Sequence, residues 1–423
     1  MADGPGRLPF WSVLRGRAIY LWVALATPAV VAFAQYSLGG QVVFKGHTAA
    51  VLLGVVGTTL AVVLWLPYRR STRWPALATV ALLMMVVTWG YQALRMFQEG
   101  TQFNFTSFAV PIVLLMIILK PPGLKDVRIG LAVFAYATIL AGGLSIVLDL
   151  ADVTPSAFIA AKNGVGRIPL LSDLFAIDTR WEGAFQHSNY AGPIGGSLIL
   201  IGASFRRWNR VAVVAGGAII LLLSQSRTAF VATCFGLLVL VLFATPMRGF
   251  RYRTAVRWVA LLSAVAVVGT YVALFDPTLA WRTHAWQDFF ALWRESPWLG
   301  VGETRVTEYF VNGAVNGPVA FTHAHNMVLD PMTRYGVPML VLVVGILALT
   351  AILAARALRL GQTLGASVTA YLIVLGLFEI PFSWSYMSIL MVPLLIAVMA
   401  SAAACQEAGT EACLREGNRV PTA

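Results

Sequence analysis

The fold is decided by residues 211–245, VAVVAGGAIILLLSQSRTAFVATCFGLLVLVLFAT, which are apolar except for Ser224-Gln225-Ser226-Arg227 near the middle. The stretch is one overlong helix or two helices joined at that polar turn, since one bilayer crossing needs about 20 residues. Arginines flank both ends: Arg206, Arg207 and Arg210 before it, and Arg248, Arg251, Arg253 and Arg257 after it. Basic flanks mark the cytoplasmic side of a membrane. The segment therefore crosses and returns, as spans 211–225 and 227–245, with Arg227 at the outer tip.

The composition supports a membrane protein. The chain has 423 residues, of which 59% are hydrophobic and 11% charged, and its mean hydropathy is +0.78. About 25% of residues are charged in ordinary soluble domains. These values exclude a soluble globular enzyme, a disordered chain and a coiled coil. The net charge of +12 would suggest nucleic acid as a partner of a soluble protein, but here the basic residues report topology and we expect no nucleic-acid partner.

Apolar runs along the chain predict an all-α polytopic protein with about twelve spans. The expected spans are 18–36, 48–67, 75–94, 104–119, 129–148, 188–204, 211–225, 227–245, 257–275, 326–347, 363–382 and 385–402. The first run lacks a small-residue cleavage site and is expected to be a retained helix. We expect one membrane domain over 1–423 with a polar cytoplasmic tail at 403–423.

The charges predict the orientation of these spans. With the N-terminus inside, the cytoplasmic side receives Arg7, Arg15, Arg17, Arg69, Arg70, Arg73, Lys120, Lys125, Arg128, the two clusters around 211–245, Arg356, Arg359, Arg415 and Arg419. Most acidic residues fall elsewhere, so the inner side is strongly positive and the remainder slightly negative. This asymmetry predicts that both termini are cytoplasmic.

Two outer segments are long, and long loops commonly carry function. They are 149–187 and 276–325, the larger one preceding the tenth span. The second is rich in tryptophan and phenylalanine, and 280–294 has helical character. We expect this helix to lie in the outer membrane interface together with membrane lipids.

Arg227 is the first candidate site residue. A charge between two apolar helices is costly and commonly functional. A guanidinium binds two phosphate oxygens at once, which favours a phosphate site; the alternative is an interfacial anchor.

His325-Asn326 is the second candidate, at the point where the large loop becomes a helix. Imidazole suits general-base catalysis, although a loop histidine is often only a surface residue. His323 and His325 do not share a helical face, which disfavours a metal pair. Asp330 and Arg334, four residues apart, are expected to form an ion pair that supports this turn.

Arg282, in the large loop, is a further candidate or an interfacial anchor. Arg180, His187 and Asn189 close the first outer loop, where function and helix capping are equally good explanations. No close acidic cluster occurs, and the three cysteines lack metal-ligand spacing. We therefore expect no metal and no cofactor, and phosphate binding by arginine.

These elements together resemble the bacterial O-antigen ligase and polymerase superfamily. Ser224-Gln225-Ser226-Arg227 resembles its Ser-x-Ser-Arg element, and Arg180 to Asn189 resembles an earlier loop element. Arg282 to Gly302 is similar to the element of its large periplasmic loop. His325-Asn326, with Gly336 beyond it, resembles its His-Asn element, although Met339 stands where a second glycine is common.

The resemblance implies a membrane glycosyltransferase of the GT-C type, metal-independent and inverting. Such a ligase moves O-antigen from undecaprenyl pyrophosphate to lipid A–core, on the periplasmic face of the inner membrane of a Gram-negative bacterium. His325 would be the general base, and Arg227, Arg282 and Arg180 would bind the donor pyrophosphate. The supporting residues would be Ser224, Ser226, Asn326, His187 and Asn189.

Three alternative functions remain open. An O-antigen polymerase uses the same donor, and a second relative glycosylates protein but often carries more chain after its last span. A membrane transporter would place charges and broken helices at mid-membrane, whereas the polar residues here collect in two outer loops.

Overall fold

The computed structural model describes residues 74–100, 109–151, 158–160, 179–181, 185, 188–244, 277–311, 323–380 and 391–417. The expected spans 18–36, 48–67 and 257–275 lie outside these residues, as does His187. Helices make up nearly all of the described part, which confirms the predicted helical class.

Every other expected span coincides with a helix. These helices are α4 (Ala76–Gln98), α5 (Ala109–Leu119), α6 (Leu124–Leu150), α8 (Ser188–Ala203), α9 (Arg207–Ser224), α10 (Arg227–Ala244), α14 (Leu329–Arg359), α15 (Leu364–Phe378) and α16 (Met391–Gly417). Among the described residues, 6 helices are long and apolar enough to cross a membrane: α4, α6, α9, α10, α14 and the Met391–Ala408 part of α16. α15 is a shorter apolar helix. The total of about twelve spans remains a prediction.

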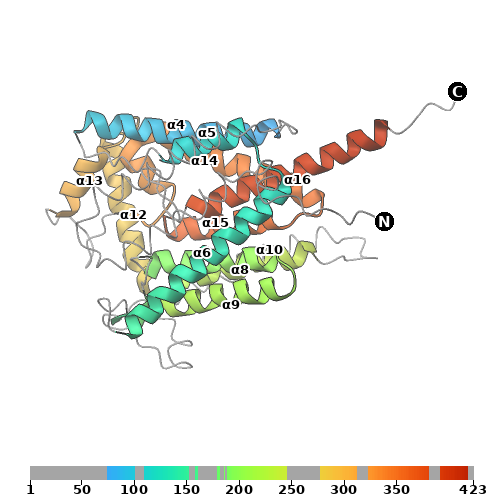
Figure 1. Ribbon diagram of the computed structural model, residues 1–423. Coiled ribbons are helices and arrows are strands. Elements are labelled where there is room, and N and C mark those ends of the chain that lie inside the picture. The colour runs from blue at the N-terminus through green and yellow to red at the C-terminus, as the bar shows by residue number, and fades with distance from the viewer. Residues whose placement is uncertain are drawn as a thin grey trace, which may run out of the picture.

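The stretch 211–245 forms two helices, as its flanking charges predict. α9 ends at Ser224 and α10 begins at Arg227, and Gln225 between them has a left-handed backbone with φ of 49°. The two arms are not simply paired: α8 lies between them and packs on both (Figure 1). Gly195 of α8 and Gly217 of α9 permit the closest approach, since a Cβ on Gly195 would lie 2.6 Å from the Leu221 backbone nitrogen. Small residues allow such contacts between helices in membranes.

The centre of the bundle is α16. Its side chains from Met391 to Ala404 are almost all buried, and it contacts α4, α6, α14 and α15. The sequence predicts a span at 385–402 followed by a tail, but the helix continues to Gly417.

The large loop 276–325 contains α12 (Pro277–Glu295) and α13 (Gly302–Val311), which confirms the helix predicted at 280–294. Both lie at one end of the bundle, with α12 running across the ends of the long helices (Figure 1). α4, α9 and α15 end here, and α8, α10 and α14 begin here. The opposite end carries the loops with Lys120, Lys125, Arg206, Arg207 and Arg359.

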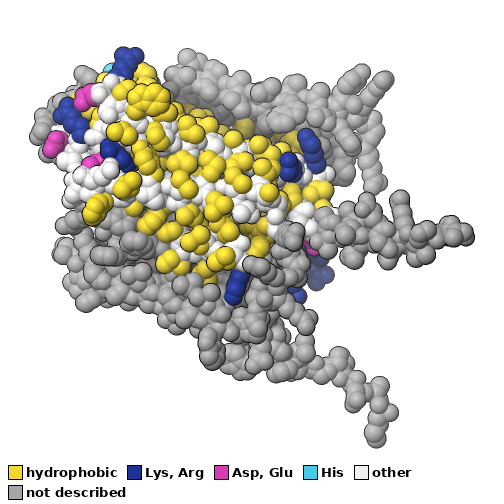
Figure 2. Space-filling view, turned by 90° about the horizontal axis from the view of Figure 1, so that it is seen from above, with side chains coloured by type: hydrophobic (Ala, Val, Ile, Leu, Met, Phe, Trp, Pro, Cys, Tyr) yellow, Lys and Arg dark blue, Asp and Glu magenta, His cyan; other side chains and the backbone are white. Residues whose placement is uncertain are grey.

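Charged side chains on the surface are concentrated at the same two ends of the bundle. Figure 2 shows one face with hydrophobic side chains over its middle and charged side chains toward its ends. Acidic side chains gather mainly at the end that carries α12 and α13. An apolar band between two polar ends is the surface expected of a bilayer-spanning bundle.

A two-stranded ribbon in the first outer loop was not predicted. β1 (Phe158–Ala160) pairs antiparallel with β2 (Thr179–Trp181), and Ile159 lies opposite Arg180. Trp181 is fully buried, with its ring edge-on to Phe185 at 5.9 Å. β2 also contacts α8 and α9, which anchors the ribbon to the bundle.

Candidate active site

The hairpin turn is built from buried serines. Ser224 and Ser226 are both buried, and the Ser224 hydroxyl donates to the Leu221 carbonyl at 2.7 Å. The Ser226 hydroxyl accepts the Ala229 N–H at 3.4 Å and caps the first turn of α10. Gly192 of α8 lies so close that a Cβ there would be 2.4 Å from Ser226 Cβ. The serines thus fix the turn against α8.

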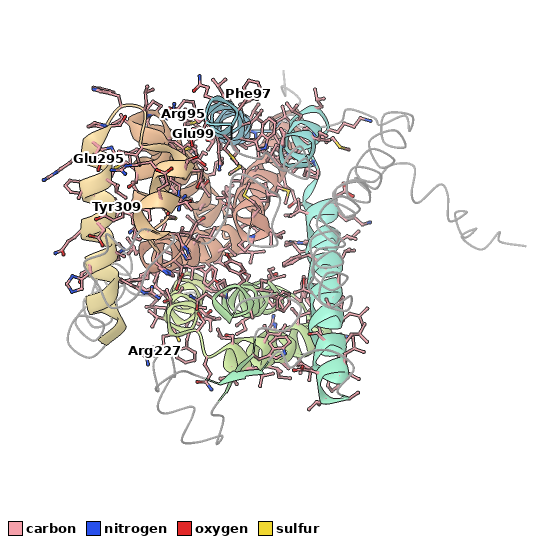
Figure 3. The ribbon with its side chains drawn as sticks, turned by 90° about the vertical axis from the view of Figure 1, so that its left-hand side faces the viewer. Arg95, Phe97, Glu99, Arg227, Glu295 and Tyr309 are labelled. Atoms are coloured by element: carbon pink, nitrogen blue, oxygen red, sulfur yellow. The ribbon has the colours of Figure 1, made fainter. Side chains whose placement is uncertain are left out.

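Arg227 is the first residue of α10 and is half-buried. Figure 3, viewed from the end that carries α12, places it on that end face below α12. The positive end of the helix dipole adds to its guanidinium charge, so this position favours an anion.

His325-Asn326 forms a tight turn docked on the end of α15. The Asn326 side-chain oxygen accepts the N–H groups of Val328 and Leu329, each at 2.9 Å, and its amide donates to the Leu377 carbonyl at 3.1 Å. The Met327 N–H donates to the Gly376 carbonyl at 2.9 Å. His325 has φ of 48°, a left-handed conformation that few non-glycine residues adopt. Asn326 therefore caps the start of α14 and fixes the turn that carries His325.

Glu379, just beyond the end of α15, joins the histidine to an arginine. Its Oε2 lies 3.0 Å from His325 Nδ1, and its Oε1 lies 2.8 Å from Arg282 Nη2. Arg282 also donates to the Phe378 carbonyl. The Glu379 side chain is 7% exposed, so the carboxylate is held almost without water between two cationic or donating partners.

The sequence interpretation missed Glu379. An acidic residue at the end of an apolar run was the available signal, because ionisable residues in or beside spans are usually paired and functional. Its partners lie 54 and 97 positions away in the chain, so no local spacing pattern could reveal them.

The surroundings decide the ionisation of Glu379. Burial raises its pKa, but the Arg282 charge, the His325 hydrogen bond and the neighbouring imidazoles outweigh burial, and the net pKa is lowered. The carboxylate is therefore charged and can accept a hydrogen bond from the Nδ1–H of His325. In the imidazole tautomer with its proton on Nδ1, Nε2 is the proton acceptor.

His323 adjoins the same turn, with its ring centroid 4.1 Å from that of His325. Burial and the neighbouring His325 lower the pKa of His323 to about 4. His323 is thus neutral at physiological pH. Among the described residues, no group of three or more His, Cys, Asp or Glu side chains is arranged to hold a metal ion.

The ion pair predicted between Asp330 and Arg334 is present, with Arg334 Nε 3.0 Å from Asp330 Oδ2. Arg334 also pairs with Glu303 of α13, whose other oxygen accepts the Tyr335 hydroxyl at 2.6 Å. Gln92 of α4 donates to that hydroxyl at 2.8 Å. The pair thereby links three elements and not only its own helix.

Part of the large loop, residues 296–301, contacts α14 at Gly336. Gly336 has φ of 77° and kinks α14, and a Cβ there would collide with the Trp298 carbonyl. The Val301 N–H donates to the Thr333 carbonyl at 2.9 Å, and the Val337 N–H donates to the Pro297 carbonyl at 3.0 Å. Loop 296–301 is therefore fastened to the α14 kink by backbone contacts that a side chain at Gly336 would block.

The remaining candidates are less closely gathered. Arg180 lies in β2, and Asn189 lies half-buried in the first turn of α8. The structure thus unites Arg282, His325 and Asn326 around Glu379, with Arg227 on the same end face (Figure 3).

The fold and the site define a multi-pass helical membrane protein with a buried carboxylate, histidine and arginine at one end. Comparison with family models narrows this class: residues 211–344 match the family described as O-antigen ligase. This match supports the resemblance of the chain to the O-antigen ligase/polymerase superfamily. The matched segment includes Arg227, Arg282 and His325, whereas Arg180 and Glu379 fall outside it. No curated protein matches the chain.

Proposed function

We propose that this protein is an O-antigen ligase: it transfers O-antigen polysaccharide from undecaprenyl pyrophosphate to a sugar hydroxyl of lipid A–core. The family match supports a ligase or polymerase that acts on lipid-linked polysaccharide. The single observation that carries the mechanism is the 3.0 Å contact between His325 Nδ1 and Glu379 Oε2.

His325 acts as the general base. With its Nδ1–H hydrogen-bonded to Glu379 and retained on the ring, His325 takes the proton of the acceptor hydroxyl at Nε2, and Glu379 stabilises the imidazolium that forms. The acceptor oxygen then forms a bond to the anomeric carbon while the bond from that carbon to the pyrophosphate oxygen breaks. One such displacement inverts the anomeric configuration. The proton leaves His325 to solvent after transfer.

Arginines stabilise the departing pyrophosphate. Arg227, Arg282 and Arg180 each supply a guanidinium, whose donors suit phosphate oxygens. Glu379 neutralises much of the Arg282 charge, so Arg227 at the start of α10 carries the larger share of anion attraction. Undecaprenyl pyrophosphate is a good leaving group without protonation, so the reaction needs neither a general acid nor a metal.

The site faces the periplasm in this proposal. Basic loops lie at the opposite end of the bundle, and the positive-inside rule puts that end in the cytoplasm. α12 crosses the outer ends of the helices (Figure 1), where it can contact both the membrane interface and the substrates. The protein then resides in the inner membrane with both termini cytoplasmic.

Complementation of a ligase-null strain tests the proposal, with lipopolysaccharide resolved on a gel. We expect capped core with the wild-type chain and uncapped core with Arg227→Gln. If the core stays uncapped while undecaprenyl-linked polymer accumulates, the protein is not the ligase. Transfer by the purified protein should survive exhaustive EDTA treatment; a loss restored by a divalent cation would contradict the metal-free mechanism.

A further inference from the structure

Two consecutive peptide units before the proposed base are each held by a side chain. The Ala324 N–H, in the His323–Ala324 peptide, donates to Asp330 Oδ1 at 2.9 Å, and the Ala324 carbonyl, in the Ala324–His325 peptide, accepts the Trp286 indole N–H at 2.9 Å. Ala324 is fully buried, so water does not compete for either bond. Each peptide unit is planar, so each bond restricts the orientation of one unit. The second unit ends at the His325 nitrogen, and its orientation sets the direction in which His325 leaves the backbone.

His325 needs such a constraint. Its left-handed backbone, with φ of 48°, is disfavoured for a residue with a Cβ and persists only when the surroundings impose it. Asn326 holds the turn from the following side through Leu377. The contacts of Asp330 and Trp286 hold it from the preceding side. The imidazole is thereby aimed at Glu379, on which the proposed proton transfer depends.

The Asp330 carboxylate is held in place by contacts to both of its oxygens. Its Oδ1 receives the Ala324 N–H while its Oδ2 lies 3.0 Å from Arg334 Nε. Arg334 is almost buried and pairs in turn with Glu303 of α13. The two oxygens of one carboxylate therefore tie the histidine turn to a neutralised ion network rather than to a mobile surface group.

Trp286 and Arg282 lie one helical turn apart on α12, so they project from the same face. Arg282 contacts Glu379, and Trp286 contacts the peptide beside His325. The Trp286 ring also lies 6.4 Å from the Phe378 ring, centroid to centroid. One face of α12 thus contacts both members of the His325–Glu379 pair.

We propose that Trp286 and Asp330 are positioning residues that hold the two peptide units on either side of Ala324 and thereby set the geometry of His325; this inference rests on the proposed ligase function. Neither residue touches substrate. Their loss lowers the rate of the chemical step and leaves the binding of donor and acceptor unchanged.

The test uses the full chain in proteoliposomes, with undecaprenyl-pyrophosphate-linked O-antigen as donor and lipid A–core as acceptor. Trp286→Phe keeps an aromatic side chain, smaller than indole, and removes the N–H donor, and Asp330→Ala removes the acceptor. We expect each to lower kcat by about 10- to 100-fold, with KM for both substrates within about twofold. Asp330→Asn, which keeps an oxygen for the Ala324 N–H, should restore much of the loss. Glu295→Gln, in an exposed ion pair with Arg305, is the matched control and should behave as wild type.

A second arm uses His325→Gln as background. If Trp286 acts through His325, adding Trp286→Phe to His325→Gln has no further effect on the residual rate. An equal loss in both backgrounds, a rise in KM, or a Trp286→Phe rate equal to that of Glu295→Gln would each overturn the inference. Full activity of His325→Gln alone would instead overturn the proposed base. Because Trp286→Phe keeps an aromatic side chain near Phe378, it provides a second test if Asp330→Ala fails to fold.

Discussion

Glu379 binds its two partners with different oxygens, and the two contacts have different consequences. The contact with His325 selects the imidazole tautomer, and the contact with Arg282 keeps the carboxylate ionised despite its burial. Replacing the charge therefore changes proton transfer and the packing of α12 together. The residue lies outside the segment matched by the family model, and its role follows from its contacts alone.

Glu379→Gln should lower transfer by about 100- to 10,000-fold, because an amide facing Nδ1 favours the wrong imidazole tautomer. The measurement is the steady-state rate of the reconstituted protein. Leaving Arg282 without its carboxylate also costs stability, so the melting temperature should be recorded beside the rate. Glu295→Gln serves again as the control. A Glu379→Gln rate within threefold of wild type would contradict the assigned role.

His323 makes the stability of the folded protein depend on pH, and the direction of the effect follows from its pKa. Its pKa is lowered to about 4 in the folded protein, against about 6.5 in an unfolded chain. The unfolded chain binds the proton more tightly, so the stability from neutral His323 is complete above about pH 6.5 and is lost as the pH falls toward 4.

We therefore expect His323→Gln to reduce the fall in melting temperature between pH 7 and pH 4.5, measured in detergent. His284→Gln, at an exposed position on α12, should leave that fall as in wild type. Parallel curves for wild type and His323→Gln would mean that His323 takes no part in the acid sensitivity.

The elements show which features the sequence could reveal. Apolar runs and flanking arginines were sufficient to divide α9 from α10 at Ser224 and Arg227, because both signals are local. The Asp330–Arg334 pair followed from helical spacing alone. Neither local signal could predict that α8 lies between the two arms of the hairpin. The convergence of Arg282, His325 and Glu379 could not be predicted from the sequence either. Those arrangements depend on tertiary packing between distant segments, for which the chain offers no periodic signal.

The α14 kink is the element that joins the large loop to the bundle, and Gly336 is the residue that permits it. Gly336→Ala should lower the melting temperature, since the left-handed backbone alone costs about 1–2 kcal/mol for a residue with a Cβ. The added clash with the Trp298 carbonyl should displace loop 296–301. Gly90→Ala in α4, where an added Cβ meets nothing within 4 Å, should be neutral or stabilising. Equal melting temperatures for the two variants would contradict this account.

The whole bundle has one end with basic loops and one end with α12, α13 and the candidate site (Figure 1). In the proposed topology, the net charge of +12 reflects the basic residues of the cytoplasmic end rather than a surface for an anionic partner.

Cysteine labelling tests the polarity directly. Trp298 is 72% exposed beside α12, and Trp208 is 83% exposed at the basic end. In a chain whose native cysteines are replaced by serine, Trp298→Cys should react with a membrane-impermeant maleimide in intact cells. Trp208→Cys should react only in inverted vesicles. The reverse pattern would place the site in the cytoplasm and exclude the proposed periplasmic ligase.

The most direct measurement is transfer by the purified protein from undecaprenyl-pyrophosphate-linked O-antigen to lipid A–core, comparing wild type with His325→Gln. We expect lipid A–core carrying O-antigen with wild type, a loss of at least about 100-fold with His325→Gln, and unchanged donor binding in that variant. Full transfer by His325→Gln, or no transfer by wild type with either substrate in excess, would contradict this expectation.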